Sequence, residues 1–353
     1  MSLINSTGYK ILIDEDTAIL KSYIDQLKPS SIFAIVDQNT KLHCLPYLED
    51  QLKLNFTCIQ TPAGESFKNL KTCSLVWNAL MQNKCDRSSL VINLGGGVIG
   101  DMGGFIASTY MRGIKFIQMP TSLLAQVDAS VGSKLGVDFL EYKNMIGLFN
   151  NPELVWIKTS FLNTLEERHI KSGLAEIIKH ALIHSEEQWT RLKAIDSLDN
   201  IIWSDYINDS VEIKNKIVLE DPLEKGLRKI LNYGHTIGHA VESYYLNTDT
   251  PLLHGEAVAL GMICESHLSY QNGMLDANAL REINSFIRKF FQFSVKLKSI
   301  GDELIERMRL DKKNFKQKIM FSYPAKIGDA VYDQLCNEEQ ILKSLDYFDN
   351  TNN

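Results

Sequence analysis

The chain has 353 residues, of which 44% are hydrophobic and 23% are charged, so it has the composition of a globular protein large enough for two domains. Its formal net charge of -6 disfavours nucleic acid and anionic membranes as partners, because both attract proteins with a positive field. No signal sequence opens the chain and no apolar run approaches the roughly 18 residues of a membrane span. We therefore expect a cytoplasmic protein without a membrane partner.

The first half of the chain alternates between two kinds of sequence pattern. Short apolar or β-branched runs at 32–36, 56–60, 90–94 and 116–119 predict strands, and the amphipathic stretch at 67–81 predicts a helix. Strands that alternate with helices are typical of a parallel sheet with crossover helices. The sequence therefore predicts an α/β domain up to about residue 157.

A glycine run follows one of these predicted strands. Gly95, Gly96 and Gly97 come directly after the run at 90–94, and Gly100 and Asp101 follow within a segment that can turn helical. Glycines at this position let the backbone approach a phosphate while the next helix offers its amide groups. A tight turn without a ligand is the alternative.

Asp37 directly follows the predicted strand at 32–36. An acidic side chain at the end of such a strand can accept hydrogen bonds from ribose hydroxyls. It can equally cap the N-terminus of the next helix. The sequence leaves both interpretations open.

After about residue 165, apolar residues recur every three or four positions, which is typical of amphipathic helices. The segments at 174–185, 205–220, 255–270 and 276–291 show this spacing. No low-complexity linker separates the α/β pattern of the first half from the helical pattern of the second, so we expect a packed domain junction near 160–170. We predict one domain over 1–165 and a mainly helical one over 166–353.

Histidines and one acidic residue in the second half predict a metal site. Glu176 and Lys179 are three residues apart, and His235 and His239 are four apart, so each pair shares one face of a helix. His254 comes from a separate segment. Three nitrogen and oxygen ligands from different elements leave positions open for substrate, as a catalytic zinc ion requires. Each histidine taken alone is better explained as a structural residue.

Six cysteines occur without a C-x-x-C pair, so we expect buried free thiols rather than disulfides or a cysteine metal site.

Five motifs give the chain a family resemblance. They are GGGVIGDMGGFIAS at 95–108, YMRGIKFIQMPTSLLAQVDASVGSK at 110–134, KNMIG at 143–147, GLAEIIKHALI at 173–183, and GLRKILNYGHTIGHAVE at 226–242 with HGE at 254–256. In these motifs, and over residues 37–329, the chain is similar to the 3-dehydroquinate synthase family of sugar-phosphate cyclases in the shikimate pathway. The resemblance implies a Rossmann-like N-terminal domain that binds NAD, a helical C-terminal domain that binds zinc or cobalt and the substrate, and a homodimer.

The resemblance also implies roles for single residues. The family's zinc ligands fall on Glu176, His235 and His254. Substrate-binding or catalytic roles fall on Arg112, Asp128, Lys134, Asn144, Lys179, Lys214, Arg228, Asn232 and His239, with a further lysine at either Lys312 or Lys313. Positions expected to contact NAD are Asp37, Glu65, Lys68, Gly95, Gly96, Gly97, Val98, Gly100, Asp101, Thr121, Ser122, Lys134, Lys143, Phe161 and Thr164.

The substrate that the resemblance implies is 3-deoxy-D-arabino-heptulosonate 7-phosphate. Its C5 hydroxyl is oxidised, phosphate is eliminated, the new ketone is reduced again, and an aldol step closes the carbocycle, so NAD undergoes no net change. A substrate with a carboxylate and a phosphate explains why an acidic protein would gather so many lysines and arginines. Singly, each of these cations reads as a surface charge.

Several positions depart from the usual family pattern. Ser133 and Leu135 replace the glycine and threonine that usually flank Lys134, and Ser122 replaces a threonine. Leu135 loses a hydroxyl group, which makes the hydrogen bonding around Lys134 the least secure expectation.

Three other functions compete with this interpretation. A sibling cyclase, such as a 2-epi-5-epi-valiolone or 2-deoxy-scyllo-inosose synthase, would share the fold, NAD and zinc, but the intact Asn232 and the segment 234–239 favour the dehydroquinate branch. A metal-dependent polyol dehydrogenase would leave the cation array unexplained. A catalytically silent NAD-binding protein would not need the expected metal ligands, yet all of them are present in the sequence.

Overall fold

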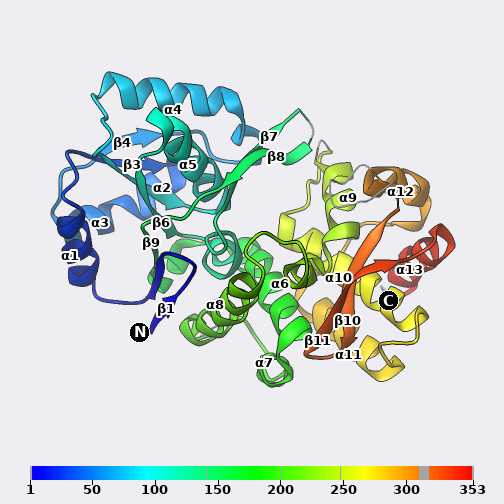
Figure 1. Cartoon of the computed structure of the whole chain (residues 1–353). Coiled ribbons are helices and arrows are strands. Elements are labelled where there is room, and N and C mark those ends of the chain that lie inside the picture. The colour runs from blue at the N-terminus through cyan, green and yellow to red at the C-terminus, as the bar shows by residue number, and fades with distance from the viewer. Residues whose placement is uncertain (1, 141, 200, 247, 310–317, 352–353) are drawn as a thin grey trace. The chain divides into compact units, whose positions relative to one another are not determined.

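The computed structural model describes residues 2–140, 142–199, 201–246, 248–309 and 318–351. Backbone contacts divide the chain into two compact units (Figure 1). The first unit comprises Met1–Ile170 and Ile202–Asn215, and the second comprises Lys171–Ile201 and Lys216–Asn353.

The first unit is built on a seven-stranded sheet with the order β1-β2-β9-β6-β5-β3-β4. All neighbouring strands are parallel except β1 and β2, which form an antiparallel pair. The strands are β1 (Ser2–Asn5), β2 (Lys10–Ile13), β3 (Ile32–Val36), β4 (Thr57–Gln60), β5 (Leu90–Gly95), β6 (Lys115–Pro120) and β9 (Leu154–Ile157).

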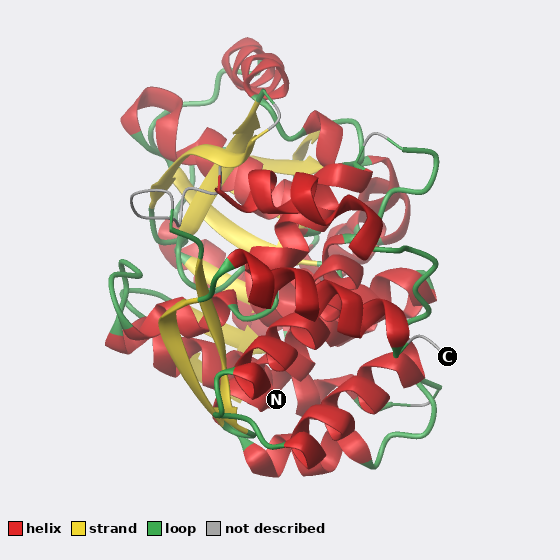
Figure 2. Ribbon diagram, turned by 90° about the vertical axis from the view of Figure 1, so that its right-hand side faces the viewer, coloured by secondary structure: helices red, strands yellow, loops and turns green. Residues whose placement is uncertain are grey.

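Both faces of this sheet are buried, which explains the continuous apolar runs of its central strands. On one face, Ala34 and Val36 pack with apolar residues of α1 (Thr17–Leu27) and α3 (Leu45–Leu52), and the short helix α2 (Gln38–His43) precedes α3 in the chain. On the other face, Phe33 and Ile35 pack with those of α4 (Leu70–Gln82) and α5 (Gly97–Thr109). Figure 2 shows the strands of this sheet in yellow and the helices in red.

The strands expected from the sequence are confirmed to within one residue at each end. The helix expected at 67–81 is confirmed as α4, which begins three residues later, at Leu70. The sequence did not predict the N-terminal pair β1 and β2. It also missed the antiparallel hairpin of β7 (Lys134–Phe139) and β8 (Tyr142–Phe149).

This hairpin explains one departure from the family pattern. Leu135 is 6% exposed and packs against α5, where a methyl group added to Gly104 would lie 2.3 Å from a Leu135 methyl. Lys134, the preceding residue, is exposed, as expected from the alternation of side chains along a strand. The leucine therefore fills the core and does not remove a hydroxyl group from the side of Lys134. Ser133 adopts φ +61, a conformation that explains a preference for glycine there.

The second unit is mainly helical and includes the two-stranded hairpin β10 (Met320–Lys326) and β11 (Asp329–Leu335). Helix α10 (His254–Gln271) is buried on all sides, which places it at the centre of this unit. Helix α8 (Trp203–Glu220) contributes its residues up to Asn215 to the first unit. The other long helices are α6 (Glu167–His184), α7 (Glu186–Lys193), α9 (His235–Tyr245), α10 (His254–Gln271), α11 (Ala277–Phe290), α12 (Gly301–Arg309) and α13 (Glu338–Asn350).

The fold class expected from the sequence, a parallel α/β sheet domain with a mainly helical C-terminal part, is thus confirmed. Within the described part of the chain, no helix combines the length and apolar character needed to cross a lipid bilayer.

Candidate active site

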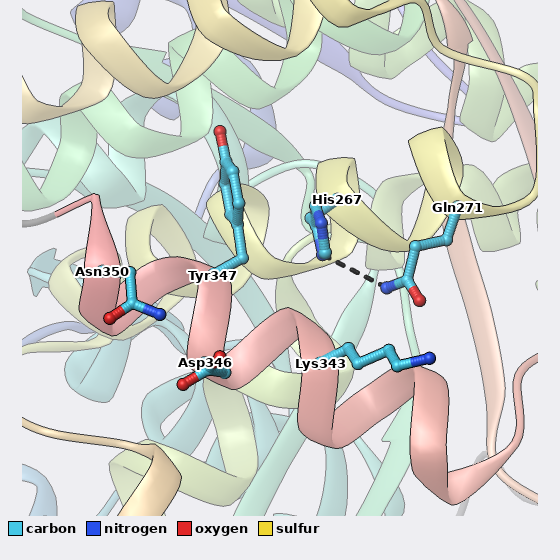
Figure 3. A pocket seen from close by; sticks show the side chains of 6 residues that line it. All are labelled: His267, Gln271, Lys343, Asp346, Tyr347 and Asn350. Carbon is cyan, nitrogen blue, oxygen red and sulfur yellow. Dashed lines mark hydrogen bonds between the residues drawn. The ribbon is translucent and has the colours of Figure 1, made fainter.

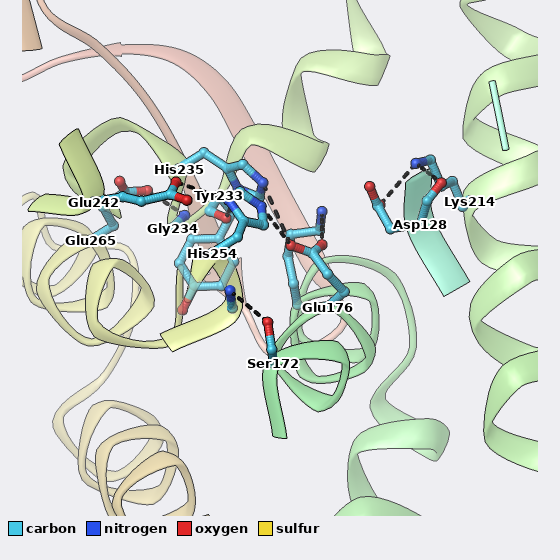
Figure 4. A network of polar contacts seen from close by, with 12 residues as sticks. Asp128, Ser172, Glu176, Lys214, Tyr233, Gly234, His235, Glu242, His254 and Glu265 are labelled. Atoms are coloured by element: carbon cyan, nitrogen blue, oxygen red, sulfur yellow. Dashed lines mark hydrogen bonds and ion pairs between the residues drawn. The ribbon is translucent and has the colours of Figure 1, made fainter. Parts of the chain in front are cut away.

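Three helices of the second unit bring four potential metal ligands together, and Figure 4 shows three of them, Glu176, His235 and His254. Glu176 lies on α6, His235 and His239 lie on α9, and His254 is the first residue of α10. The Nε2 atoms of His235 and His254 each lie 3.6 Å from Oε1 of Glu176. Ligand atoms of the three histidines all lie within 4.8 Å of one another. The cluster therefore has the spacing of groups that share one cation.

Glycines allow these helices to approach closely. Gly234 precedes α9 with φ +79, and a methyl group added to it would lie 2.6 Å from the side chain of Met262 on α10. A methyl group on Gly255 of α10 would lie only 1.9 Å from the carbonyl oxygen of Ser172 on α6. No larger residue fits either position, so the sequence pattern Y-G-H and H-G-E fixes the helix spacing that brings the ligands together.

Hydrogen bonds to the far side of each ring orient the histidines. Nδ1 of His235 lies 3.0 Å from the carbonyl oxygen of Tyr233, which can only accept, so this nitrogen donates. Nδ1 of His254 lies 3.1 Å from Oε2 of Glu242. Both rings therefore present Nε2 toward Glu176, an arrangement typical of histidines that ligate metals.

The electrostatics of the cluster also fit a cation. Burial lowers the pKa of the His254 imidazole, but the carboxylates of Glu242 and Glu176 outweigh burial and raise it to about 9. Glu176 is fully buried and forms an ion pair with Lys179, one turn further along α6. One carboxylate and two or three neutral imidazole nitrogens form the donor set that Zn²⁺ and Co²⁺ accept. The residues present therefore fit a divalent ion.

Two further expected residues, Arg228 and Asn232, lie on the short 3₁₀ helix Leu227–Asn232 that precedes α9. The Arg228 side chain is 2% exposed and donates to the Pro222 carbonyl oxygen at 2.7 Å. The Asn232 amide donates to Oε1 of Glu224 at 2.8 Å. The loop before the helix thus holds both side chains in place.

In the first unit, the glycine run forms a recess at the carboxyl ends of β5 and β6. Gly96 caps α5, and a methyl group on it would lie 3.3 Å from Oγ of Ser122. The amide of Thr121 donates to the carbonyl oxygen of Gly95 at 3.0 Å. The recess is lined by Gly95, Gly96, Gly97, Gly100, Gln118, Pro120, Ala125, Ala129 and Ser130. Such a cradle with the N-terminus of α5 suits the phosphates of a dinucleotide.

Charged residues expected to contact NAD form two ion pairs in the same unit. Lys68, only 4% exposed, lies 2.6 Å from Asp101, and Lys143 lies 3.4 Å from Glu65. Burial by itself lowers the pKa of the Lys68 ammonium, but Asp101 and Glu65 outweigh burial and raise it. Lys68 is therefore a permanently charged residue held at the first turns of α5.

The remaining expected residues differ in their surroundings. The carboxylate of Asp37 caps α2 by accepting from the Thr40 amide at 2.8 Å, so the capping interpretation holds for this side chain. The ring of Phe161 packs in the core against Tyr47 and Trp156. Lys214 lies 2.9 Å from Oδ1 of Asp128.

Other expected residues are at the surface of the first unit or outside the described residues. Arg112, Asn144 and Thr164 are exposed, Val98 is half-buried in the first turn of α5, and Lys134 begins β7. Arg112 and Asn144 both have positive φ values, +69 and +49. Lys312 and Lys313 lie outside the described residues.

A second recess lies elsewhere in the second unit (Figure 3). Tyr347 of α13 stacks on His267 of α10 with 4.2 Å between ring centroids, and Gln271 lies 3.1 Å from Nδ1 of His267. The recess is lined by His267, Gln271, Lys343, Asp346, Tyr347 and Asn350, and none of these is an expected site residue. This recess is therefore separate from the residues expected to form the site.

Reasoning from the sequence missed Glu242 as the partner of His254. A signal was available, because Glu242 follows His235 by seven residues and His239 by three, which places all three on one face of α9. The partner helix that brings His254 to this face is not encoded in that spacing.

Comparisons with known proteins agree with this geometry. A family model described as 3-dehydroquinate synthase N-terminal matches residues 58–172, and one described as 3-dehydroquinate synthase C-terminal matches residues 173–314. The 3-dehydroquinate synthase of Parabacteroides distasonis is 39% identical over 96% of this chain and 97% of its own length.

Two solved structures resemble the chain along its whole length. The 2-epi-5-epi-valiolone synthase from Streptomyces hygroscopicus with NAD⁺ and Zn²⁺ bound has a TM-score of 0.84 at 25% identity, covering 99% of this chain and 98% of the other. A 2-deoxy-scyllo-inosose synthase complexed with carbaglucose-6-phosphate, NAD⁺ and Co²⁺ has a TM-score of 0.87 at 22% identity, covering 98% and 99%. The latter similarity shows a shared fold.

Proposed function

The chain belongs to the 3-dehydroquinate synthase family, and we propose from this premise that it converts 3-deoxy-D-arabino-heptulosonate 7-phosphate to 3-dehydroquinate and phosphate. This activity is a phosphate-eliminating lyase of the shikimate pathway with transient reduction of NAD. The convergence of Glu176, His235 and His254 is the observation that carries the proposal. It supplies the cation site that such chemistry needs.

Glu176, His235 and His254 would hold a divalent ion, Zn²⁺ or Co²⁺. When bound, this ion lowers the pKa of a coordinated hydroxyl and polarises the ketone derived from it. His239 follows on the same face of α9, with its ring centroid 5.2 Å from that of His235. We assign it to proton transfer at its imidazole nitrogens rather than to ligation, because three protein ligands leave coordination positions open.

The glycine recess and the start of α5 would hold NAD, which accepts a hydride and returns it within one turnover. The close approach of Gly96 to Ser122 supports this assignment, because a larger residue would fill the cradle. Lys68 and Asp101 hold their charges at the same helix. We accordingly assign NAD binding to residues 1–165 and metal binding to residues 166–353, the two domains expected from the sequence.

Buried cations would bind the anionic ends of the substrate. Lys179 and Arg228 in the second unit are 1% and 2% exposed, and Lys214 in the first unit is 6% exposed. A buried cation interacts with an anion more strongly than a solvated one does. Arg228 offers a planar fork to a phosphate or carboxylate, and Asn232 offers an amide close to it in the chain.

A phosphate-release assay tests the proposal. We expect phosphate release from the heptulosonate phosphate with NAD in catalytic amounts and without accumulation of NADH. Release of no phosphate, or a stoichiometric rise in NADH with glycerol as substrate, would contradict the proposal. The second result would support a polyol dehydrogenase.

Three variants test the residue assignments. Glu176→Ala and His254→Ala should abolish both bound metal and turnover, because each removes a ligand. His239→Ala should lower the rate while metal remains bound. Loss of metal from the His239→Ala variant would show that His239, and not His235, is the metal ligand on α9.

A sibling sugar-phosphate cyclase is the second candidate function. The two similar structures are cyclases of this kind, but at 22% and 25% identity they are more distant than the 3-dehydroquinate synthases at 38–40%. Assaying other sugar phosphates beside the heptulosonate phosphate separates the two functions.

The same proposal includes a homodimer in the cytoplasm. Exposed apolar residues gather on the hairpin of β7 and β8, where Phe139, Leu140, Met145 and Phe149 are 44 to 81% exposed. All six cysteines are free thiols, as is usual in a reducing compartment; five are buried as expected, whereas Cys58 is exposed. Light scattering of the purified protein tests the dimer, and a monomer at all concentrations would contradict it.

A further inference from the structure

A buried carboxylate links the two helices that carry the histidine ligands. Glu265 lies on α10 and is fully buried. Its Oε2 accepts a hydrogen bond from the amide of Gly234 at 2.6 Å, and its Oε1 accepts one from the amide of Ile237 at 2.9 Å. These two amides flank His235 at the start of α9. Glu265 therefore contacts the backbone on either side of a metal ligand.

The start of α9 needs such a partner from another helix. Its N-cap residue, Gly234, has no side chain that could accept from the first amides of the helix. Substitution of glycine by a capping residue is excluded by its φ of +79 and by the contact with Met262. The carboxylate of Glu265 supplies the acceptor, and its negative charge lies at the positive end of the helix.

Glu265 also shares a helix face with the other histidine ligand. It follows His254 by eleven residues on α10, which corresponds to about three turns, so the two side chains point in a similar direction. Figure 4 shows Glu265 close to Gly234, the residue that precedes His235. Helix α10 thus carries the ligand His254 as its first residue. Further along, it carries Glu265, which accepts hydrogen bonds from the start of α9, the helix of the ligand His235.

We propose that Glu265 is a positioning residue of the metal site, which fixes the turn from Tyr233 to His235 so that Nε2 of His235 faces Glu176. The Tyr233 carbonyl that orients the His235 ring belongs to this turn. This inference rests on the proposed function, because it takes the cluster to be a metal site. A purely structural cap would affect stability alone, whereas a positioning residue also sets the affinity and geometry of the bound ion.

The variant Glu265→Gln tests this role with nearly unchanged size. It removes the charge and turns one oxygen into an NH₂ group that faces an amide hydrogen. We expect the Kd for Zn²⁺ and for Co²⁺ to rise at least about tenfold, the usual effect of losing a group that orients a ligand. The visible absorption spectrum of the Co²⁺ protein should also change, because the His235 nitrogen moves relative to the ion.

Ser269→Ala is the matched control. Ser269 is fully buried on the same helix, one turn beyond Glu265, and donates to the Pro324 carbonyl oxygen at 2.5 Å. Its loss should lower the melting temperature without changing the metal Kd or the Co²⁺ spectrum. This control separates a loss of stability from a loss of ligand position.

The outcomes distinguish the inference from the proposed function. A folded Glu265→Gln protein with the wild-type Kd and spectrum would overturn the inference and leave the function intact. A wild-type protein that binds neither Zn²⁺ nor Co²⁺ would overturn both. Should Glu265→Gln fail to fold, Glu265→Asp keeps the charge but shortens the side chain by one methylene group, which draws both oxygens away from the amides of Gly234 and Ile237. A wild-type Kd in that variant would equally refute the role.

Discussion

Replacing Gly255 by alanine should separate two metal ligands. The added methyl group would lie 1.9 Å from the carbonyl oxygen of Ser172, whereas real contacts of this kind stay above 3.0 Å. Helices α6 and α10 must therefore move apart locally by about 1 Å, since neither backbone can give way alone. Glu176 lies one turn beyond Ser172, and His254 directly precedes Gly255, so this movement lengthens the distance between them.

The magnitude follows from two opposing terms. Alanine in place of a helical glycine stabilises by roughly 0.5 to 1 kcal/mol. Overpacking of a buried contact costs about 1 to 3 kcal/mol. We expect a net loss of stability on the order of 1 to 2 kcal/mol, together with at least a tenfold rise in the Kd for Zn²⁺, because a metal site tolerates ligand displacements of only about 0.2 Å.

Thermal unfolding of the metal-free protein and competition with a chromogenic chelator measure these two quantities. Gly100→Ala is the matched control, because its methyl group would meet Gln118 at an ordinary 3.5 Å inside α5. The control should keep the wild-type metal Kd and not lose stability. A Gly255→Ala protein that is more stable than wild type and binds Zn²⁺ equally well would refute the packing argument.

Three further predictions concern the charges. Glu242→Gln should raise the Zn²⁺ Kd about 10- to 100-fold, because it weakens the bond that orients His254; an unchanged Kd in chelator competition would contradict this. The Zn²⁺ Kd of the wild type should fall as pH rises from 7 and level off near pH 9, because below its pKa of about 9 the His254 ring carries a proton that the ion must displace; a Kd independent of pH, measured by titration calorimetry, would refute it. Lys68→Met should destabilise the protein by about 3 kcal/mol, because it leaves Asp101 without its ammonium partner, and adding Asp101→Asn should recover most of that loss in urea unfolding.

Sequence and structure agree best where a pattern is local. The apolar runs at 32–36 and 90–94 predicted strands, and the structure has β3 and β5 there. Spacings of three and four predicted that Glu176 and Lys179 share a helix face, and the two side chains form an ion pair. These relations need only the geometry of one strand or one helix.

The sequence predicts the structure less well where a side chain could have either of two roles. Asp37 follows a strand, a position that suits both a ribose contact and a helix cap, and only the structure shows its oxygen on the Thr40 amide. Leu135 was expected to weaken the surroundings of Lys134, yet it packs against Gly104 on the other face of its strand. Which face of a hairpin is covered depends on the helix that packs there, and the sequence of the hairpin does not contain that information.

The sequence by itself determined the class of fold, the family, and the residue types able to hold a divalent ion, because periodicity and motif order are properties of the chain. Only the tertiary structure decided how those residues meet. Glu242 and Glu265 gained their roles from the crossing of α9 and α10, where contacts between distant turns fix the rings of His235 and His254. Helical spacing defines which side chains share a face of a helix. Which other helix packs against that face depends on the packing of the whole folded unit.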